Sequence, residues 1–231
     1  MSLSPEEWTT IFLSLRVALL ATLICLPAGL ALAWLLARKN FWGKSALNSL
    51  IHLPLVLPPV VTGYLLLVAF GKRGVIGAFL EQTFGLIFAF RWTGAALAAA
   101  LMALPLMVRA IRLSIESIDQ RLEGAAATLG ASPLRVFATV TLPLAAPGLL
   151  VGTILTYVKA LGEFGATITF VSNIPGQTQT LSLSIYSLLQ TPDGDAAALR
   201  LILLSIALAL AALLASELFA KRLTQRVTGT A

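Results

Sequence analysis

The sequence contains few charged residues. Of its 231 residues, 11% are charged and 58% are hydrophobic. A typical water-soluble domain has about 25% charged residues, which cover its surface. This chain has too little polar surface for a soluble globule, so the composition predicts an integral membrane protein.

Side chains that react or bind metals are also scarce. The single cysteine, Cys25, lies in an apolar run, so it cannot form a disulfide within the chain and is interpreted as a small core residue. The single histidine, His52, has no titratable neighbour, which favours an interfacial position over a proton relay. Acidic residues are scattered at predicted helix ends. We therefore expect neither a catalytic group nor a metal site, and the chain is not predicted to be an enzyme.

The chain has no Gly-rich phosphate-binding loop, so any ATP that it uses must be bound by another chain. Basic residues outnumber acidic ones, 16 to 10. In a membrane protein this excess indicates loops near anionic lipid rather than a nucleic-acid partner.

Five apolar stretches are long enough to cross a bilayer: residues 17–36, extended to about Ile11, then 49–70, 93–108, 144–162 and 196–216. Most basic residues follow the same ends of these stretches, and they are Arg38, Lys39, Lys44, Arg109, Arg112, Arg121, Arg135, Lys221, Arg222 and Arg226. Basic loops stay in the cytoplasm, which predicts a periplasmic N-terminus and a cytoplasmic C-terminus. A sixth span through 164–189 would place the basic tail outside. The predicted fold is an all-α bundle of five transmembrane helices forming one domain over residues 1–231.

The second stretch is rich in helix-breaking residues. It reads HLPLVLPPVVTGYLLL and includes Pro54, Pro58, Pro59 and Gly63. Such an interrupted helix is expected only where it is buried in protein or lines a water-filled path. Pro58, Pro59 and Gly63 are therefore pathway candidates. In the first stretch, Pro27 and Gly29 are interpreted as packing features.

Two outer segments are too short or too interrupted to span. Residues 71–92 are predicted to form a loop with an interfacial helix, bounded by aromatic residues. Residues 162–195 are predicted to be partly re-entrant and to cap the pathway, with an amphipathic piece at 181–189. Lys159 and Glu163 fit either an i,i+4 ion pair at the interface or a functional pair.

An inner loop, residues 114–143, contains LEGAAATLGASPLRVFATVTLP. Gly130 suits a left-handed helix end, Ser132 an N-cap and Pro133 a first helical position, so we expect two short helices joined by a sharp bend. On the first helix an apolar stripe has i, i+3, i+4, i+7 spacing and consists of Leu122, Ala125, Ala126 and Leu129. The stripe either packs on the chain's own helix ends or is presented to a groove on a soluble partner.

The loop resembles the signature of ABC importer permeases: Glu-Ala-Ala, three residues, Gly, nine residues, Ile, any residue, Leu-Pro. The matching positions here are Gly124, Ala125, Ala126, Gly130, Val140, Leu142 and Pro143. Gly124 departs from the family Glu, and Glu123 is the neighbouring carboxylate. The resemblance implies that the loop docks on an ATP-hydrolysing subunit. The implied coupling residues are Leu122, Glu123, Gly124, Ala125, Ala126, Leu129, Gly130, Pro133, Leu142 and Pro143.

Residues 52–77 and 161–181 further resemble molybdate permeases, whose near relatives carry sulfate or tungstate. This resemblance implies a homodimer in the bacterial inner membrane with the pathway on its two-fold axis. It also implies two ATP-binding subunits, which hold ATP and Mg, and a periplasmic oxyanion-binding protein. The implied outer gate comprises Gly162, Glu163, Phe164, Gly165, Thr167 and Thr169.

From chemistry, Thr167, Thr169, Ser172 and Asn173 offer hydroxyl and amide donors to an oxyanion without a cation that would hold it. Gly162 and Gly165 are expected to let two subunits approach closely. Two other function classes compete with an importer subunit. A secondary transporter would show two related halves and ionisable residues at the midplane, and neither is visible. A membrane enzyme would need a catalytic constellation.

Overall fold

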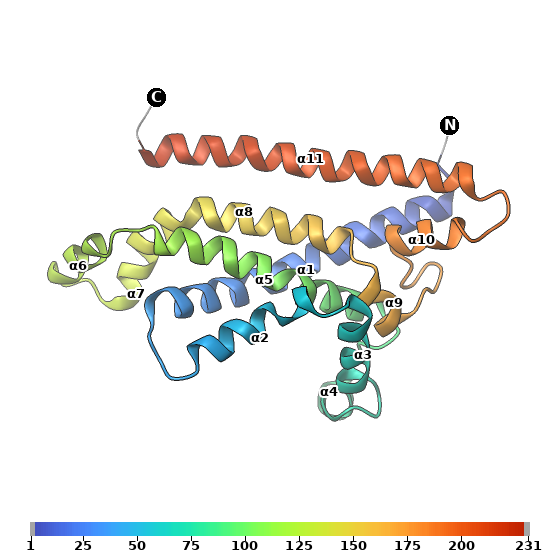
Figure 1. The fold of residues 1–231 in the computed structure, drawn as a ribbon, viewed down its shortest axis with the longest axis horizontal. Coiled ribbons are helices and arrows are strands. Elements are labelled where there is room, and N and C mark those ends of the chain that lie inside the picture. Colours follow the sequence, from blue (N-terminus) through green and yellow to red (C-terminus); the bar gives the residue numbers. More distant parts are fainter. Residues whose placement is uncertain (1–2, 229–231) are drawn as a thin grey trace.

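The computed structural model describes the backbone of residues 3–228 and the side chains of residues 3–214. Helix is the only regular structure in this part of the chain, which confirms the all-α prediction. Four long helices lie side by side in Figure 1: α1 (Pro5–Arg38), α5 (Trp92–Glu116), α8 (Leu142–Leu161) and α11 (Asp195–Thr228). The shorter elements are α2 (Lys44–Val56), α3 (Pro59–Phe70), α4 (Val75–Phe84), α6 (Gln120–Thr128), α7 (Pro133–Val136), the π-helical turn η1 (Phe137–Thr141), α9 (Gly165–Val171) and α10 (Leu181–Leu188).

Within the described residues, four helical segments are long and apolar enough to cross a membrane: Pro5–Arg38, Trp92–Glu116, Pro133–Leu161 and Asp195–Leu214. The pair α2 and α3 would make a fifth, but the two helices meet at a bend of 114°. The second predicted span is therefore not one helix. Pro58 and Pro59 supply no backbone N–H, and proline pushes the preceding Leu57 into an extended conformation, with ψ of 144°. As a result α2 follows the long helices while α3 leaves them (Figure 1).

The helices are longer than hydropathy predicts. α1 already begins at Pro5 because Ser4 and Glu7 form a capping box, in which the Ser4 N–H donates to Glu7 Oε2 at 2.7 Å. α5 continues past Val108 to Glu116. Polar first and last turns extend a helix beyond its apolar part, and sequence hydropathy does not detect them.

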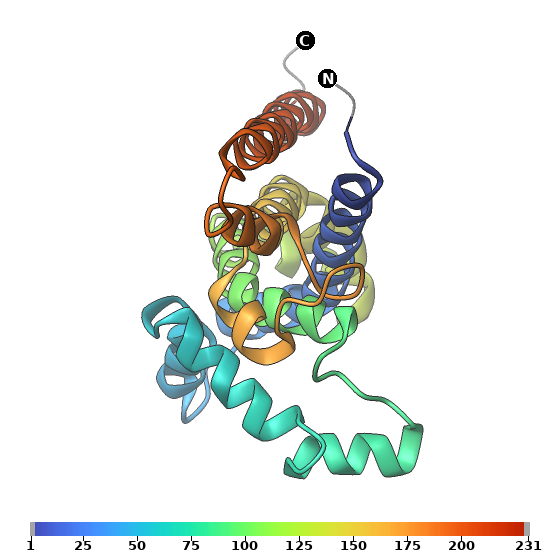
Figure 2. The same ribbon diagram turned by 90° about the vertical axis from the view of Figure 1, so that its right-hand side faces the viewer.

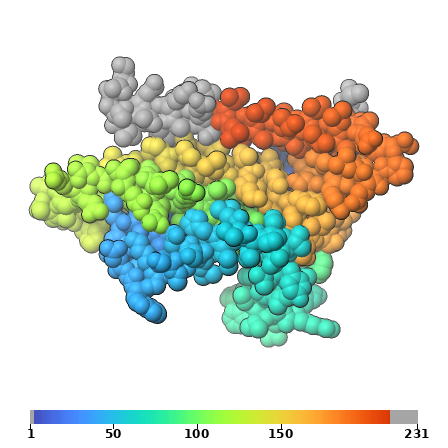
Figure 3. Space-filling view, in the orientation of Figure 1, coloured from blue at the N-terminus to red at the C-terminus, as the bar shows by residue number. Residues whose placement is uncertain are grey.

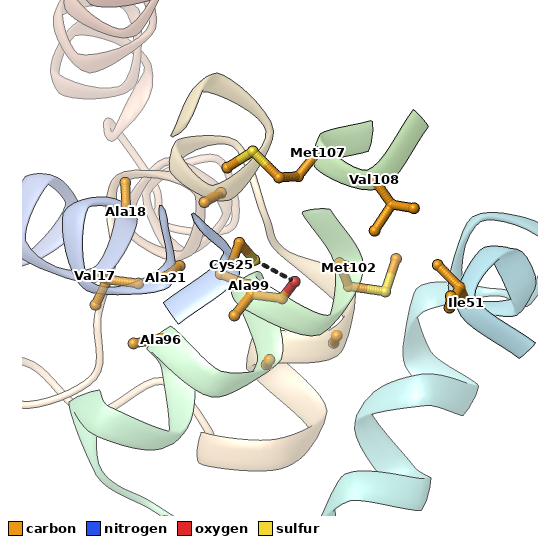
Figure 4. Close-up of a cluster of buried hydrophobic side chains, with 14 of the residues drawn as sticks. Val17, Ala18, Ala21, Cys25, Ile51, Ala96, Ala99, Met102, Met107 and Val108 are labelled. Atoms are coloured by element: carbon orange, nitrogen blue, oxygen red, sulfur yellow. Dashed lines mark hydrogen bonds between the residues drawn. The ribbon is translucent and has the colours of Figure 1, made fainter. Parts of the chain in front are cut away.

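α5 forms the centre of the bundle and packs against both α1 and α8. Six of its buried residues are alanines, which let neighbouring helices approach closely, and they are Ala95, Ala96, Ala98, Ala99, Ala100 and Ala103. A Cβ at Gly29 of α1 would collide with the Met107 side chain, so this glycine is a packing feature, as expected. Cys25 is buried in the same core and its thiol donates to the Ala100 carbonyl at 3.2 Å (Figure 4).

The predicted inner loop and the predicted outer gate segment lie at opposite ends of the bundle. α6, α7, the start of α2 and the last part of α11 share one end, whereas the start of α1, α9 and α10 share the other (Figures 1 and 2). The expected helix in the 71–92 segment is present as α4, which ends at Gly85 with φ of 66°. α3 and α4 project from the side of the bundle (Figure 3). The side chains of the basic tail, Lys221, Arg222 and Arg226, lie outside the described residues.

Candidate functional site

The predicted sharp bend after α6 is present. The N-terminus of α6 is capped by Asp119, whose carboxylate accepts from the Arg121 N–H at 2.9 Å. It ends before Gly130, which has φ of 86°. A Cβ at Gly130 would have no neighbour within 4 Å. The glycine is therefore required for its left-handed backbone and not for space.

The expectation of two short helices is correct only for the first. Pro133 opens α7 as expected, but α7 continues through η1 into α8, so the helical run extends from Pro133 to Leu161. Pro143 supplies no N–H to the helix, and the π-helical turn just before it is a local adjustment of the hydrogen bonding that keeps the run continuous. Leu142 and Pro143 therefore belong to the base of a long helix.

The apolar stripe of α6 is mostly exposed: Leu122, Ala125 and Leu129 are exposed, and Ala126 is half-buried. No residue of α6 is buried, and Leu129 is 89% exposed. Leu134, in the first turn of α7, is 77% exposed. Packing on the chain's own helix ends does not account for these side chains. Sequence reasoning missed Leu134, although an apolar residue directly after Pro133 in a polar loop was a usable signal.

Glu123 is held within the chain. Its Oε2 lies 2.9 Å from Arg38 Nε, and its Oε1 accepts from the Thr141 hydroxyl at 2.6 Å. The Arg38 side chain is only 9% exposed. We call Arg38, Glu123 and Thr141 the loop clamp, because they join α6 to the end of α1 and to η1. Arg38 was interpreted only as an inner-loop charge, since no sequence signal links positions 85 residues apart.

Gly124 occupies the position of the family Glu. A Cβ there would meet nothing within 4 Å, and the residue is exposed. A carboxylate at this position would therefore point into open space. The carboxylate of the neighbouring Glu123 is engaged by the loop clamp.

At the opposite end of the bundle, α8 is followed by three residues outside any helix, Gly162, Glu163 and Phe164. Glu163 is buried; its Oε2 lies 2.8 Å from Lys159 Nζ, and its Oε1 accepts from the Ala166 N–H at 3.1 Å. Lys159 and Glu163 thus form an i,i+4 ion pair. Glu163 also fixes the first turn of α9.

The two predicted pathway stretches touch each other through glycines. A Cβ at Gly63 of α3 would lie 2.5 Å from the Ala166 carbonyl oxygen and 2.8 Å from Thr169 Cβ. A Cβ at Gly165 would lie 2.7 Å from Pro59 Cβ. The backbones of α3 and α9 are therefore in direct contact, beside the α2–α3 bend at Pro58 (Figure 1). We call this contact the α3–α9 junction.

This junction corrects one expectation. Gly165 lies so close to Pro59 of the same chain that a side chain would not fit there. Close approach of a second subunit is therefore not needed to account for this glycine. Gly162 differs: it is exposed, and the nearest atom to an added Cβ is 3.8 Å away. Of these two glycines, only Gly162 is exposed.

The donors proposed for an oxyanion are largely used within the chain. Thr167 is buried, and the Thr169 hydroxyl donates to the Gly165 carbonyl at 2.9 Å. Asn173 Nδ2 donates to Ser187 Oγ at 2.6 Å. Ser172, the fourth proposed donor, is exposed. Phe164 packs against Tyr186, with ring centroids 5.0 Å apart.

Within the described residues, no group of three or more His, Cys, Asp or Glu side chains could hold a metal ion. The candidate site therefore has two parts. Exposed apolar side chains of α6 and α7 lie at one end of the bundle, and the α3–α9 junction lies at the other. Neither has the geometry of a catalytic centre.

The chain is similar to known transport proteins over most of its length. Residues 26–225 match the model of the binding-protein-dependent transport system inner membrane component. The chain is 58% identical over 221 residues to the molybdenum transport system permease protein ModB of Escherichia coli K12, with 96% of each chain covered. It matches the protein of the same name from Haemophilus influenzae at 58% over 96% of each chain. The sulfate transport system permease protein CysT of Salmonella typhimurium is 35% identical, with 98% of this chain and 81% of that protein covered.

Solved structures show the same fold. A bacterial ABC transporter involved in alginate import gives a TM-score of 0.71 at 21% identity, covering 98% of this chain and 81% of the other. The inward-facing MetNI methionine ABC transporter gives 0.72 at 16% identity, covering 96% and 99%. At such low identities the likeness concerns the arrangement of helices and not the substrate.

Proposed function

Because the chain belongs to the family of inner membrane components of binding-protein-dependent transport systems, we propose that it is the membrane-spanning subunit of an ATP-driven importer that carries molybdate into the cytoplasm. The identity of 58% to molybdenum permease proteins over 96% of the chain supports molybdate. The 35% identity to a sulfate permease makes sulfate the second candidate. The chain is a permease and not an enzyme.

The exposed stripe of α6 carries the mechanistic part of this proposal. Leu122 and Leu129 are at least half exposed on a helix that has no buried residue. Helices with such a face bind in apolar grooves of partner proteins. The chain has no Gly-rich phosphate-binding loop, so ATP and Mg belong on the partner. The partner is a separate ATP-hydrolysing subunit, which docks on α6 and drives the permease.

The assembly that follows contains two copies of this chain, two ATP-binding subunits and a periplasmic oxyanion-binding protein. The α6 end is cytoplasmic and the gate end is periplasmic, in the bacterial inner membrane. Basic side chains near the α6 end support this orientation, and they are Arg38, Lys39, Lys44, Arg121 and Arg135. The exposed Gly162 and the partly exposed Phe164 are the outer-gate residues nearest the second copy.

The docking surface is tested with Ala126→Trp, which adds an indole to the centre of the stripe. Close-packed interfaces tolerate such an insertion poorly. We expect the purified permease to keep its melting temperature, since α6 packs against little of its own chain, but to lose co-purification with the ATPase subunit. Thr128→Trp adds the same ring to the opposite, exposed face of α6 and is expected to bind normally.

The substrate is tested in proteoliposomes that contain the complete assembly with its binding protein. We expect molybdate to stimulate ATP hydrolysis and to be taken up, with sulfate competing weakly. Normal ATPase binding by Ala126→Trp would contradict the docking surface. Equal or better uptake of sulfate would replace molybdate by the second candidate.

A further inference from the structure

A groove of about 510 Å³ runs between α5 and α8 on the outside of this chain. Its walls are apolar and include Leu106 and Leu113 of α5 and Val151 and Leu155 of α8. At its base the two helices are in direct contact, because a Cβ at Gly148 would collide with the Ser114 side chain. One charged residue, Arg109 of α5, lines the groove.

Arg109 is exposed, and none of the ion pairs formed by the described side chains includes it. The next arginine on α5 is different: Arg112 Nε lies 2.7 Å from Glu116 Oε1, and its NH1 donates to Asn48 Oδ1 at 2.9 Å. Arg109 lies 17 residues after the outer start of α5, or about 26 Å along the helix, and about 10 Å before its inner end. Arg109 therefore lies in the inner part of the groove, toward the cytoplasmic end that its place among the inner basic residues predicts.

The groove leads toward the outer gate. Its α8 residues, Gly148, Val151 and Leu155, are spaced by three or four positions, and the same helical spacing continues to Lys159 and Gly162. One face of α8 therefore joins the groove to the start of the gate segment. Lys159 is half-buried there and paired with Glu163. The face thus carries a paired cation at its outer end and the free Arg109 at its inner end.

We propose that the groove between α5 and α8 is the inner part of the transport route and that Arg109 is its contact for the transported tetrahedral oxyanion. This inference rests on the proposed function and adds a substrate-contacting residue to it. The planar guanidinium offers paired N–H donors that match two oxygens of an oxyanion. The neighbouring walls are apolar and supply no second cation, so the contact is weak enough for release into the cytoplasm.

The first test uses Arg109→Gln, which removes the charge and keeps a polar side chain. In the assembled importer we expect molybdate uptake to fall about tenfold, as loss of one charged hydrogen bond predicts. Arg109→Lys should retain most uptake, whereas Arg73→Gln, at an exposed arginine of the outer loop, should have no effect. Uptake of molybdate by the wild-type assembly is the reference. If the wild type takes up no molybdate, the proposed function is wrong; if only the variant is unaffected, the role of Arg109 is wrong.

The second test uses cysteine chemistry, because Cys25 is the only native cysteine and is buried. In Arg109→Cys, a membrane-impermeant thiosulfonate should label position 109 from the cytoplasmic side, and molybdate should slow the labelling. An aminoethyl thiosulfonate, which restores a positive charge, should restore uptake, and a sulfonate reagent should not. Leu19→Cys, at an exposed position on α1, should resist labelling if that face meets lipid.

The phosphate of an anionic lipid could bind the Arg109 guanidinium as the transported oxyanion does. Uptake by Arg109→Gln is therefore compared with wild-type uptake in vesicles of two lipid compositions. The proposal expects the Arg109→Gln defect in pure phosphatidylcholine vesicles as well as in vesicles with phosphatidylglycerol. A defect seen only with phosphatidylglycerol would assign Arg109 to a lipid headgroup and overturn the proposal. Unchanged uptake by Arg109→Gln in both membranes, or no labelling of Arg109→Cys, would overturn it too.

Discussion

Glu123 and Gly124 are neighbours in the sequence but differ in their surroundings. Glu123 stands next to the position where related permeases have a glutamate, yet its carboxylate is bound by Arg38 and Thr141 of its own chain. Gly124, at the family position, faces open space. The loop clamp therefore orients α6 and leaves the apolar stripe as the surface proposed to bind the ATPase subunit.

The loop clamp predicts a measurable coupling between α1 and α6. Glu123→Gln leaves the nearly buried Arg38 without its counterion, and we expect a loss of about 1 to 3 kcal/mol in stability, seen as a lower melting temperature. The same change should weaken ATPase binding, because α6 loses its orientation. Arg38→Gln alone should act similarly, and the double variant should cost less than the sum of both. Strictly additive effects would show that the pair is not coupled.

At the scale of helices, the α3–α9 junction depends on two small residues. Gly63→Val would place a branched side chain on the Ala166 carbonyl and Thr169, and the two backbones would have to separate. We expect a lower yield of folded permease and loss of molybdate uptake, since overpacking typically costs about 1 to 3 kcal/mol. The measurement is the melting temperature together with uptake in proteoliposomes.

Gly162→Ala is the matched control in the same segment. An added Cβ there has its nearest neighbour at 3.8 Å, so the isolated subunit should keep its melting temperature. If a second copy of the chain approaches at Gly162, Gly162→Ala should weaken the dimer. Measuring dimer formation beside the melting temperature therefore distinguishes a glycine needed between subunits from one needed within the subunit. A Gly63→Val protein of normal stability and activity would refute the close contact between α3 and α9.

At the scale of the whole molecule, the separation of the two functional ends predicts a topology. Thr128 of α6 and Val75 of α4 are both exposed and lie in segments assigned to opposite sides of the membrane. With Cys25 buried, single cysteines at these positions can be labelled without background. We expect an impermeant reagent to label Val75→Cys in intact cells and Thr128→Cys only after the inner membrane is opened. The reverse pattern would invert the proposed orientation.

The sequence alone determined the properties that depend on local chemistry. Low charge and long apolar stretches give a helical membrane protein, the left-handed requirement at Gly130 gives the bend after α6, and the spacing over Gly124–Pro143 gives the family. Only the tertiary structure decided which distant residues meet. The Arg38–Glu123 pair, the contact of Gly63 with Ala166 and the groove at Arg109 join positions far apart in the chain, and helix packing sets these contacts. The direction of α3 after Pro58 and the continuity of α7 with α8 were likewise decided by packing, because prolines bend the α2–α3 pair by 114° whereas other prolines are accommodated inside the Pro133–Leu161 run.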